Sequence, residues 1–224
     1  MKKKLLFYKI KFKILSILLP NNIHNFLFNY LRKDHTVLDV GCGNDSVLKV
    51  KALQSNCKYF GLDIADYNLK EKDLIDSYII ADKSKFAKKI LDAPLLDIAI
   101  CSHNLEHCEE PYAVLRNILR KLKSRGMLYL SFPSNESIYF PNRKGTLNYY
   151  DDPTHQKSQL KLKKIIRILK ENGSEIVHST KNNSPKLMKL IGLINERRSR
   201  KEGRLLLGTA YYWGFESIFW IRKK

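Results

Sequence analysis

The segment Thr36–Ser46, which reads TVLDVGCGNDS, constrains the fold of this chain more than any other. A short apolar run typical of a buried strand reaches Asp39 and leads directly to Gly41 and Gly43. Glycines at a strand-to-helix turn allow unusual backbone angles and let a ligand come close to the main chain. The N-terminus of the following helix offers N–H groups to a carboxylate. The segment therefore predicts a cofactor site at the end of a buried strand.

A second strand that ends in an acid supports this prediction. The run Tyr59–Asp63, YFGLD, follows the glycine turn after about 20 residues, the spacing expected of a ribose-binding acid. The carboxylate of Asp63 can accept hydrogen bonds from both hydroxyls of a ribose. The order of strand, glycine turn, helix, strand and acid is more specific than a pair of glycines alone.

From Thr36 onward, short apolar runs alternate with amphipathic stretches, the pattern of βαβ units in one α/β domain that covers residues 36–224. The predicted strands are Thr36–Val40, Lys58–Asp63, Tyr78–Ala81, Leu96–Cys101, Met127–Phe132, Glu175–Ser179 and Glu216–Arg222. The predicted helices are Pro111–Lys123, Ser158–Glu171 and Lys186–Asn195. The last of these lies in a basic insertion, residues 180–214, which precedes the final strand.

Residues 1–35 form a basic, amphipathic helical segment outside this pattern. One helical face can collect the apolar side chains of Leu5, Phe12, Leu15, Leu18 and Leu19, with lysines beside it. Such a face fits a helix that lies on anionic lipid, with residues 1–20 as the contact, and equally a helix that packs on the domain. The apolar run is too short to span a bilayer, so the expected location is the cytoplasm, with peripheral attachment to the inner membrane face as a further possibility.

Charge and cysteine content limit which other partners and which cellular compartment are expected. Lys and Arg number 41 against 22 Asp and Glu, a formal net charge of +19, which attracts nucleic acid, anionic lipid or phosphate-bearing substrates. A general bias of composition toward lysine also accounts for part of that excess. The 4 cysteines show neither a CxxC pair nor zinc-ligand spacing, so no metal site is predicted and a reducing compartment is expected.

Several motifs together resemble the class I S-adenosylmethionine-dependent methyltransferases. They are VLDVGCG, FGLDI, IIAD, LDIAICSHNLEHCEEP and LKSRGMLYLSFPS. The resemblance implies a Rossmann-like, seven-stranded, mostly parallel sheet with an antiparallel last strand and helices on both faces, and S-adenosyl-L-methionine as cofactor. It implies a cofactor site made of Asp39, Gly41, Cys42, Gly43, Asp63, Ile64, Asp82, Ser102 and His103. One departure is GNDS in place of the usual third glycine, and we expect Asp45 there to point outward or to cap the next helix.

Methyl transfer requires an aligned acceptor and, for a hydroxyl or amine, a group that removes a proton. His103 and His107 follow the fourth predicted strand. Asp152 and His155 lie in the Tyr-rich stretch YYDDPTH, which resembles the acceptor-side loop of methyltransferases from bacterial surface-polysaccharide gene clusters. Aromatic rings beside polar groups suit a sugar. These four residues are the catalytic candidates. As alternatives, His107 only shapes its loop, and Asp152 and Thr154 cap a helix near Ser158 while His155 packs.

The favoured function is O-methylation of a sugar or other small molecule in surface-glycan biosynthesis, with a small-molecule or glycan acceptor as the main partner. An RNA methyltransferase is suggested by charge alone, and the segment SHNLEH lacks the Asn/Asp-Pro-Pro-Tyr type of site for a base amine. The N-terminal helix also fits a methyltransferase of a quinone or lipid head group. The departure at GNDS leaves a non-catalytic cofactor-binding protein as the remaining alternative.

Overall fold

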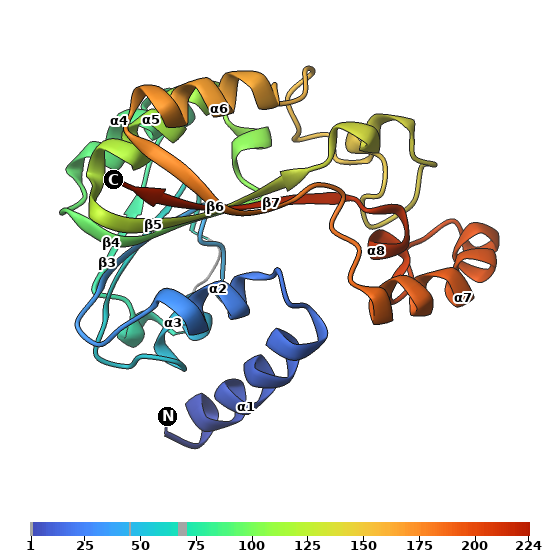
Figure 1. Ribbon diagram of the computed structural model, residues 1–224, viewed down its shortest axis with the longest axis horizontal. Helices are drawn as coiled ribbons and strands as arrows, with labels where there is room; N and C mark the ends of the chain where they lie inside the picture. Colours follow the sequence, from blue (N-terminus) through green and yellow to red (C-terminus); the bar gives the residue numbers. More distant parts are fainter. Residues whose placement is uncertain (1, 45, 67–70) are drawn as a thin grey trace.

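The computed structural model describes residues 2–44, 46–66 and 71–224 (Figure 1). Its 7 strands form one sheet in the order β3-β2-β1-β4-β5-β7-β6. The strands are β1 (Thr36–Val40), β2 (Lys58–Asp63), β3 (Ser77–Ile80), β4 (Leu96–Ser102), β5 (Leu122–Pro133), β6 (Ser174–Thr180) and β7 (Glu216–Lys223). β1 to β5 pair in parallel, whereas β7 runs antiparallel to both β5 and β6. The predicted fold class is confirmed. The expectation for Asp45 lies outside the described residues.

The connections place a crevice at the end of β1. β1 pairs with β2 on one side and with β4 on the other, so the chain leaves β1 in opposite directions along the sheet. Ligands of open α/β sheets bind outside the carboxyl ends of the strands at such a reversal of strand order. The glycine turn after β1 and the segment after β4 therefore border the same crevice.

Two helical layers cover the sheet (Figure 1). One layer holds α1 (Lys2–Leu18), α2 (Ile23–Tyr30) and α3 (Ser46–Lys51), and the other holds α4 (Phe86–Lys89), α5 (Pro111–Lys121) and α6 (Leu162–Glu171). Successive side chains of a strand point to opposite faces, so Val37 joins the core beneath α2 and α3 while Leu38 joins the core beneath α4, α5 and α6. Burial on both faces explains why the strands are almost continuously apolar.

Three helical boundaries differ from the sequence prediction. α6 begins at Leu162 and not near Ser158, because the preceding residues make tertiary contacts: Leu160 is buried and the N–H of Lys161 donates to the Tyr112 hydroxyl at 2.9 Å. α5 ends at Lys121, where β5 takes over. α7 (Lys186–Glu202) continues past its predicted end at Asn195, through Arg197, Arg198, Arg200 and Lys201, and is followed by Gly203. A short helix, α8 (Thr209–Trp213), was not predicted.

The segment between β6 and β7 forms a helical hairpin that is fixed to the loop after β5. α7 and the start of α8 meet at two glycines, since a Cβ on Gly192 would lie 2.1 Å from the carbonyl oxygen of Gly208. The N–H of Lys144 donates to Gly203 O, and the N–H of Leu205 donates to Lys144 O, both at 2.9 Å. The hairpin and that loop therefore form one wall beyond the carboxyl ends of the strands.

The apolar face predicted on α1 packs on the domain. Phe12 is 4% exposed, and its ring stacks on His24 of α2 with centroids 4.3 Å apart. Burial, followed by the charges of Lys49 and Lys11, lowers the pKa of His24 to about 4, as expected of an imidazole enclosed beneath a helix. Of the two interpretations of this face, packing is the one observed. No helix in the described part of the chain is long and apolar enough to cross a membrane.

Candidate active site

The glycine turn after β1 adopts the backbone conformation that its sequence predicts. Gly41 and Gly43 have φ of +74° and +54°, which side chains with a Cβ rarely adopt. A Cβ on Gly41 would lie 2.2 Å from Nδ2 of Asn104. The side chain of Asn104, in the segment after β4, therefore packs directly on the main chain of the turn. Beyond its immediate chain neighbours, no atom of the described residues lies within 4 Å of a Cβ added to Gly43. The turn therefore presents bare backbone to open space.

Asp63 at the end of β2 is bonded to this turn. It is 5% exposed, and its Oδ2 accepts the N–H of Gly43 at 2.8 Å while its Oδ1 accepts the N–H of Ile64 at 2.8 Å. A carboxylate offers about four acceptor positions, so two remain after these bonds. A buried acid with spare acceptor capacity beside an open glycine turn fits the ribose of a nucleoside cofactor.

The other residues predicted for the cofactor occupy different positions. Asp39 is 2% exposed beneath the turn, where it accepts the Tyr59 hydroxyl at 2.9 Å and where burial raises its pKa. Cys42 is also buried, and burial raises the pKa of its thiol. Oγ of Ser102 lies 3.1 Å from Oγ of Ser131, and Asp82 is exposed. Asp39 and Cys42 are therefore buried beneath the turn and support its backbone.

A cavity of about 300 Å³ lies along the turn, and five of the predicted cofactor residues line it. They are Gly41, Gly43, Asp63, Ile64 and His103. The described lining does not include Asp39, Cys42, Asp82 or Ser102, and at the third strand Lys83 lines the cavity next to Asp82. The apolar lining residues Phe86, Ala87 and Val114 could not be predicted from sequence, because their pattern is that of ordinary helix core.

A second cavity, of about 360 Å³, adjoins the first. Both cavities are lined by His103 and His107, so the two spaces meet at these imidazoles. The predicted catalytic residues Asp152 and His155 line the second cavity from the opposite loop. The structure therefore brings His103, His107, Asp152 and His155 together. The helical hairpin completes the wall with Asn183, Leu205, Ala210, Tyr211 and Phe215.

His103 lies between two carboxylates. Its Nδ1 is 3.1 Å from Oε1 of Glu106, and its Nε2 is 3.0 Å from Oε1 of Glu216. Burial alone would lower the pKa of His103, but hydrogen bonds to Glu106 and Glu216 outweigh it and raise the pKa to about 10. The φ of +48° at this residue is strained for a side chain with a Cβ. An imidazolium with both N–H groups committed has no lone pair with which to accept a proton.

His107 and His155 differ from His103 because Nε2 of each makes no hydrogen bond to the described residues. The Thr154 hydroxyl donates to Oδ1 of Asp152 at 2.6 Å, so it accepts the Nδ1–H of His107 at 2.8 Å. The Nδ1–H of His155 donates to the carbonyl of Tyr149 at 2.6 Å. In both rings Nδ1 therefore holds the proton and Nε2 keeps its lone pair.

The D-P-T-H loop does not cap a helix. The side chain of Asp152 also accepts the N–H of Thr154 at 2.8 Å, which makes a local turn. α6 begins at Leu162, ten residues downstream of Asp152, and its N-cap residue Lys161 makes no side-chain capping bond. The alternative role as a helix cap is therefore wrong, and the loop instead faces the second cavity.

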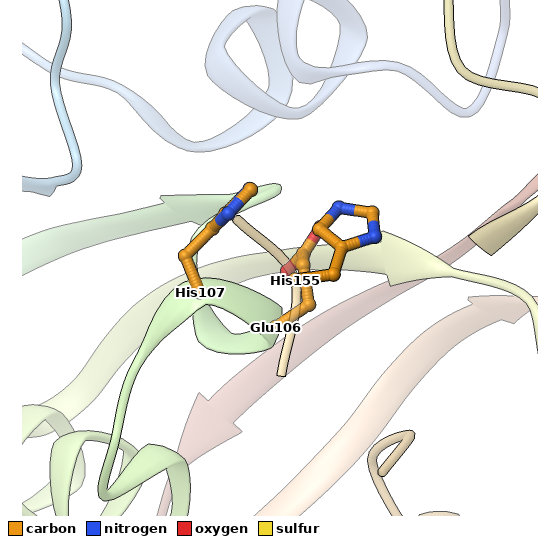
Figure 2. A group of neighbouring side chains, drawn as sticks. All are labelled: Glu106, His107 and His155. Carbon is orange, nitrogen blue, oxygen red and sulfur yellow. The ribbon is translucent and has the colours of Figure 1, made fainter. Parts of the chain in front are cut away.

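Ligand atoms of Glu106, His107 and His155 lie within 4.8 Å of one another, the spacing of a cation-binding group (Figure 2). Glu106 and His107 share the short turn after β4, and His155 comes from the D-P-T-H loop. The sequence analysis assigned no metal ligands, because no motif joins positions so far apart in the chain.

Glu216 is the functional residue that sequence reasoning could have found. It is the first residue of β7 and pairs with Pro133 at the end of β5. Because β7 is antiparallel, it begins at the edge where the parallel strands end. An acid at the start of the predicted last strand therefore belongs beside the active site.

Comparisons with known proteins agree with this geometry. A family model described as "Methyltransferase domain" matches residues 17–179. A crystal structure of an S-adenosylmethionine-dependent methyltransferase from Archaeoglobus fulgidus shares 21% identity over 95% of this chain and 99% of that chain, with a TM-score of 0.60. The plantazolicin methyltransferase BamL, solved with a triazolic desmethylPZN analog and S-adenosylhomocysteine, shares 14% identity over 99% of this chain and 90% of that chain, with a TM-score of 0.59.

A chain solved in the complex of the Haloferax volcanii Trm112 methyltransferase activator with its methyltransferase partner shares 13% identity over 98% of this chain and 96% of that chain, with a TM-score of 0.63. No curated protein sequence matches the chain. The structural likenesses establish the shared fold, and the family model covers more than half of the chain. With the open turn at Gly43 and the acceptor capacity of Asp63, the chain belongs to the methyltransferase-domain family and is an S-adenosylmethionine-dependent methyltransferase.

Proposed function

We propose that the chain methylates a hydroxyl group of a sugar or other small molecule in surface-glycan biosynthesis. The observation that supports this most is the junction of the two cavities at His103 and His107. The second cavity combines the rings of Tyr211 and Phe215 with polar groups such as Asn183. Aromatic faces beside a few convergent polar groups suit the alternating apolar and hydroxyl surfaces of a saccharide.

S-adenosylmethionine supplies a methyl carbon attached to a positively charged sulfur. Gly43 and Asp63 hold its nucleoside, and His103 forms the partition between cofactor and acceptor. Glu106 and Glu216 fix both nitrogens of that imidazole, so the partition does not turn. On the acceptor side, His107 and His155 present Nε2 lone pairs to the hydroxyl that reacts. The protein thus positions the acceptor and stabilises the loss of its proton.

The test is an acceptor panel with methyl-labelled S-adenosylmethionine. The purified chain is incubated with a saccharide, its lipid-linked form, RNA and a quinol, and the products are mapped by mass spectrometry. The expected product is an O-methyl sugar, and Asp63→Asn serves as the cofactor-deficient control. Label found only in RNA or quinol would replace this function by the corresponding one. Intact cofactor binding without transfer to any acceptor would instead indicate a non-catalytic binding protein.

We propose further that the chain acts at the cytoplasmic face of an anionic membrane, with α1 as the contact. The face of α1 opposite Phe12 is apolar and exposed. Its side chains, Leu6, Phe7, Ile10, Ile14 and Ile17, are 53–73% exposed. Lys9, Lys11 and Lys13 are exposed on the same helix. An apolar stripe beside lysines is the pattern of a helix that lies in a lipid interface.

α7 supplies a second set of exposed apolar side chains close to the end of α1. The set comprises Leu187, Leu190, Leu193 and Ile194, which are 49–72% exposed. Asn21, just after α1, donates to Oδ1 of Asn183 at 3.2 Å and lies 3.1 Å from Nε2 of His178. Both helices lie on the α2 and α3 side of the sheet (Figure 1). This supports a single membrane-facing side that would bring the second cavity near a lipid-linked acceptor.

The double substitution Ile10→Glu/Ile14→Glu is expected to reduce association with phosphatidylserine vesicles more than tenfold. Two half-exposed isoleucines contribute about 2 kcal/mol if they enter lipid, and added acids oppose the anionic surface. Vesicle co-sedimentation measures the effect, with Leu95→Glu as the control because Leu95 is 58% exposed and lies outside α1, directly before β4. Unchanged association of the double variant would remove α1 as the contact. Deleting the helix is a poorer test because it also removes Phe12 from the core.

A further inference from the structure

The group formed by Glu106, His107 and His155 is held in place by backbone contacts. The N–H of Gln156 donates to Glu106 O at 2.8 Å, and its side-chain amide donates to His107 O at 3.2 Å. These bonds join the turn after β4 to the D-P-T-H loop next to His155. The rings of His107 and His155 have centroids 4.7 Å apart. The geometry of the group is therefore held by hydrogen bonds from Gln156 to the main-chain carbonyls of Glu106 and His107.

The proton positions on the two imidazoles match those of metal ligands. A histidine that binds a metal through one nitrogen usually donates the other N–H to a carbonyl or to a carboxylate-linked group, which fixes the tautomer. His155 donates to the Tyr149 carbonyl, and His107 donates to Thr154, whose hydroxyl in turn donates to Asp152. Both Nε2 atoms consequently carry lone pairs.

Glu106 provides an independent observation. It is 1% exposed, and its Oε1 is 3.1 Å from Nδ1 of His103. Its Oε2 is buried and has no hydrogen-bond partner among the residues that the structure describes. An unpaired buried carboxylate oxygen is costly. In the neutral tautomers that these bonds favour, neither His107 nor His155 donates to it, because each ring carries its proton at Nδ1. A cation between these three side chains would satisfy all of them.

We propose that Glu106, His107 and His155 bind a divalent first-row transition cation such as Zn²⁺, Mn²⁺ or Co²⁺. Two imidazoles and one carboxylate are a ligand set of this ion class and leave coordination positions open. All three residues line the second cavity, so the open positions face the acceptor. The carboxylate of Asp152 flanks the site, with Oδ2 4.0 Å from Nε2 of His155. This inference rests on the proposed function: the cation would occupy the Nε2 lone pairs of His107 and His155 and would then itself bind and polarise the acceptor hydroxyl in their place.

The full chain, stripped with a chelator, is titrated with Co²⁺ alone and followed by visible absorption and calorimetry. We expect one Co²⁺ per chain with the spectrum of a nitrogen–oxygen site. Glu106→Gln and His155→Gln each remove one ligand and should weaken binding by more than about a hundredfold, beyond the 10–100-fold loss typical of a residue that only supports a ligand. His35→Gln, at the amino end of β1, is the matched control and should bind as the wild type does.

Absence of Co²⁺ binding to the wild type would overturn the proposal, as would equal weakening by His35→Gln. Unchanged binding in both ligand variants would overturn it as well, and their S-adenosylmethionine binding verifies that they fold. The failure of the proposed function is distinguishable from this. If Co²⁺ binds as expected but no hydroxyl acceptor is methylated, the cation site stands and the O-methylation proposal falls.

Discussion

Replacing Asp63 with Asn is expected to weaken S-adenosylmethionine binding more than tenfold, or about 1.4 kcal/mol and above. Hydrogen bonds to a charged acceptor contribute about 1.5–3 kcal/mol, and Asp63 is buried where water does not compensate for their loss. The amide has one acceptor oxygen, so it cannot keep the N–H bonds of Gly43 and Ile64 and also accept both ribose hydroxyls. Isothermal titration calorimetry gives the dissociation constants directly.

Asp97→Asn is the matched control for this substitution. Asp97 also accepts a backbone N–H at a strand, from Thr36 at 2.8 Å, and pairs with Lys123, but it lies at the amino ends of the strands. Its variant should bind the cofactor with wild-type affinity. Equal affinities for wild type and Asp63→Asn would remove Asp63 from the cofactor site.

His103→Gln is expected to reduce the free energy of unfolding by roughly 2 kcal/mol. The substitution leaves Glu106 and Glu216 as neighbouring carboxylates without their shared cation. Breaking a fully buried ion pair typically costs about 3–5 kcal/mol. The His103 side chain is 37% exposed to the cavity, so we expect the smaller figure because solvent screens part of the interaction. Urea unfolding at neutral pH measures the loss.

A double-mutant cycle identifies the cause of that loss. Glu216→Gln removes one of the two carboxylates, so His103→Gln/Glu216→Gln should lose about 1 kcal/mol less than the sum of the single variants. His178→Gln is the control, because His178 contacts Asn21 and Thr180 and no carboxylate. Strict additivity of the two single losses would show that His103 is not stabilised by its carboxylates.

The sheet could be predicted from sequence because its signals are local. Each strand is a short, nearly continuous apolar run between polar turns, and all seven predicted runs became strands. The glycine turn and Asp63 could be predicted in the same way, because both lie within one βαβ unit. Gly41, Gly43, Asp63 and Ile64 line the first cavity, and their binding of the cofactor stays a prediction.

The acceptor side could be predicted only in part, because its wall joins distant segments. Nothing local indicates that Tyr211 and Asn183 would face His155, since their placement depends on the hairpin packing at Gly192 and Gly208. Glu106 was noticed as part of a motif, but its unpaired Oε2 is visible only once the loops are assembled.

The N-terminal helix α1 shows a different limit of prediction from sequence. α1 is apolar on two faces, one through Leu5 and Phe12 and another through Ile10 and Ile14, so periodicity indicates a helix without indicating which face is buried. Which face is buried depends on the domain surface, where the ring of Phe12 stacks on His24. Only the exposed face remains available for lipid.

A crystal structure of the chain with S-adenosylhomocysteine most directly tests the claim that the Gly41–Gly43 turn and Asp63 bind the methyl donor. We predict a nucleoside in the first cavity, with its ribose hydroxyls on the carboxylate of Asp63 and its sulfur directed toward His103 and His107. A cavity without density for the ligand, or a ligand bound elsewhere on the chain, would contradict the account.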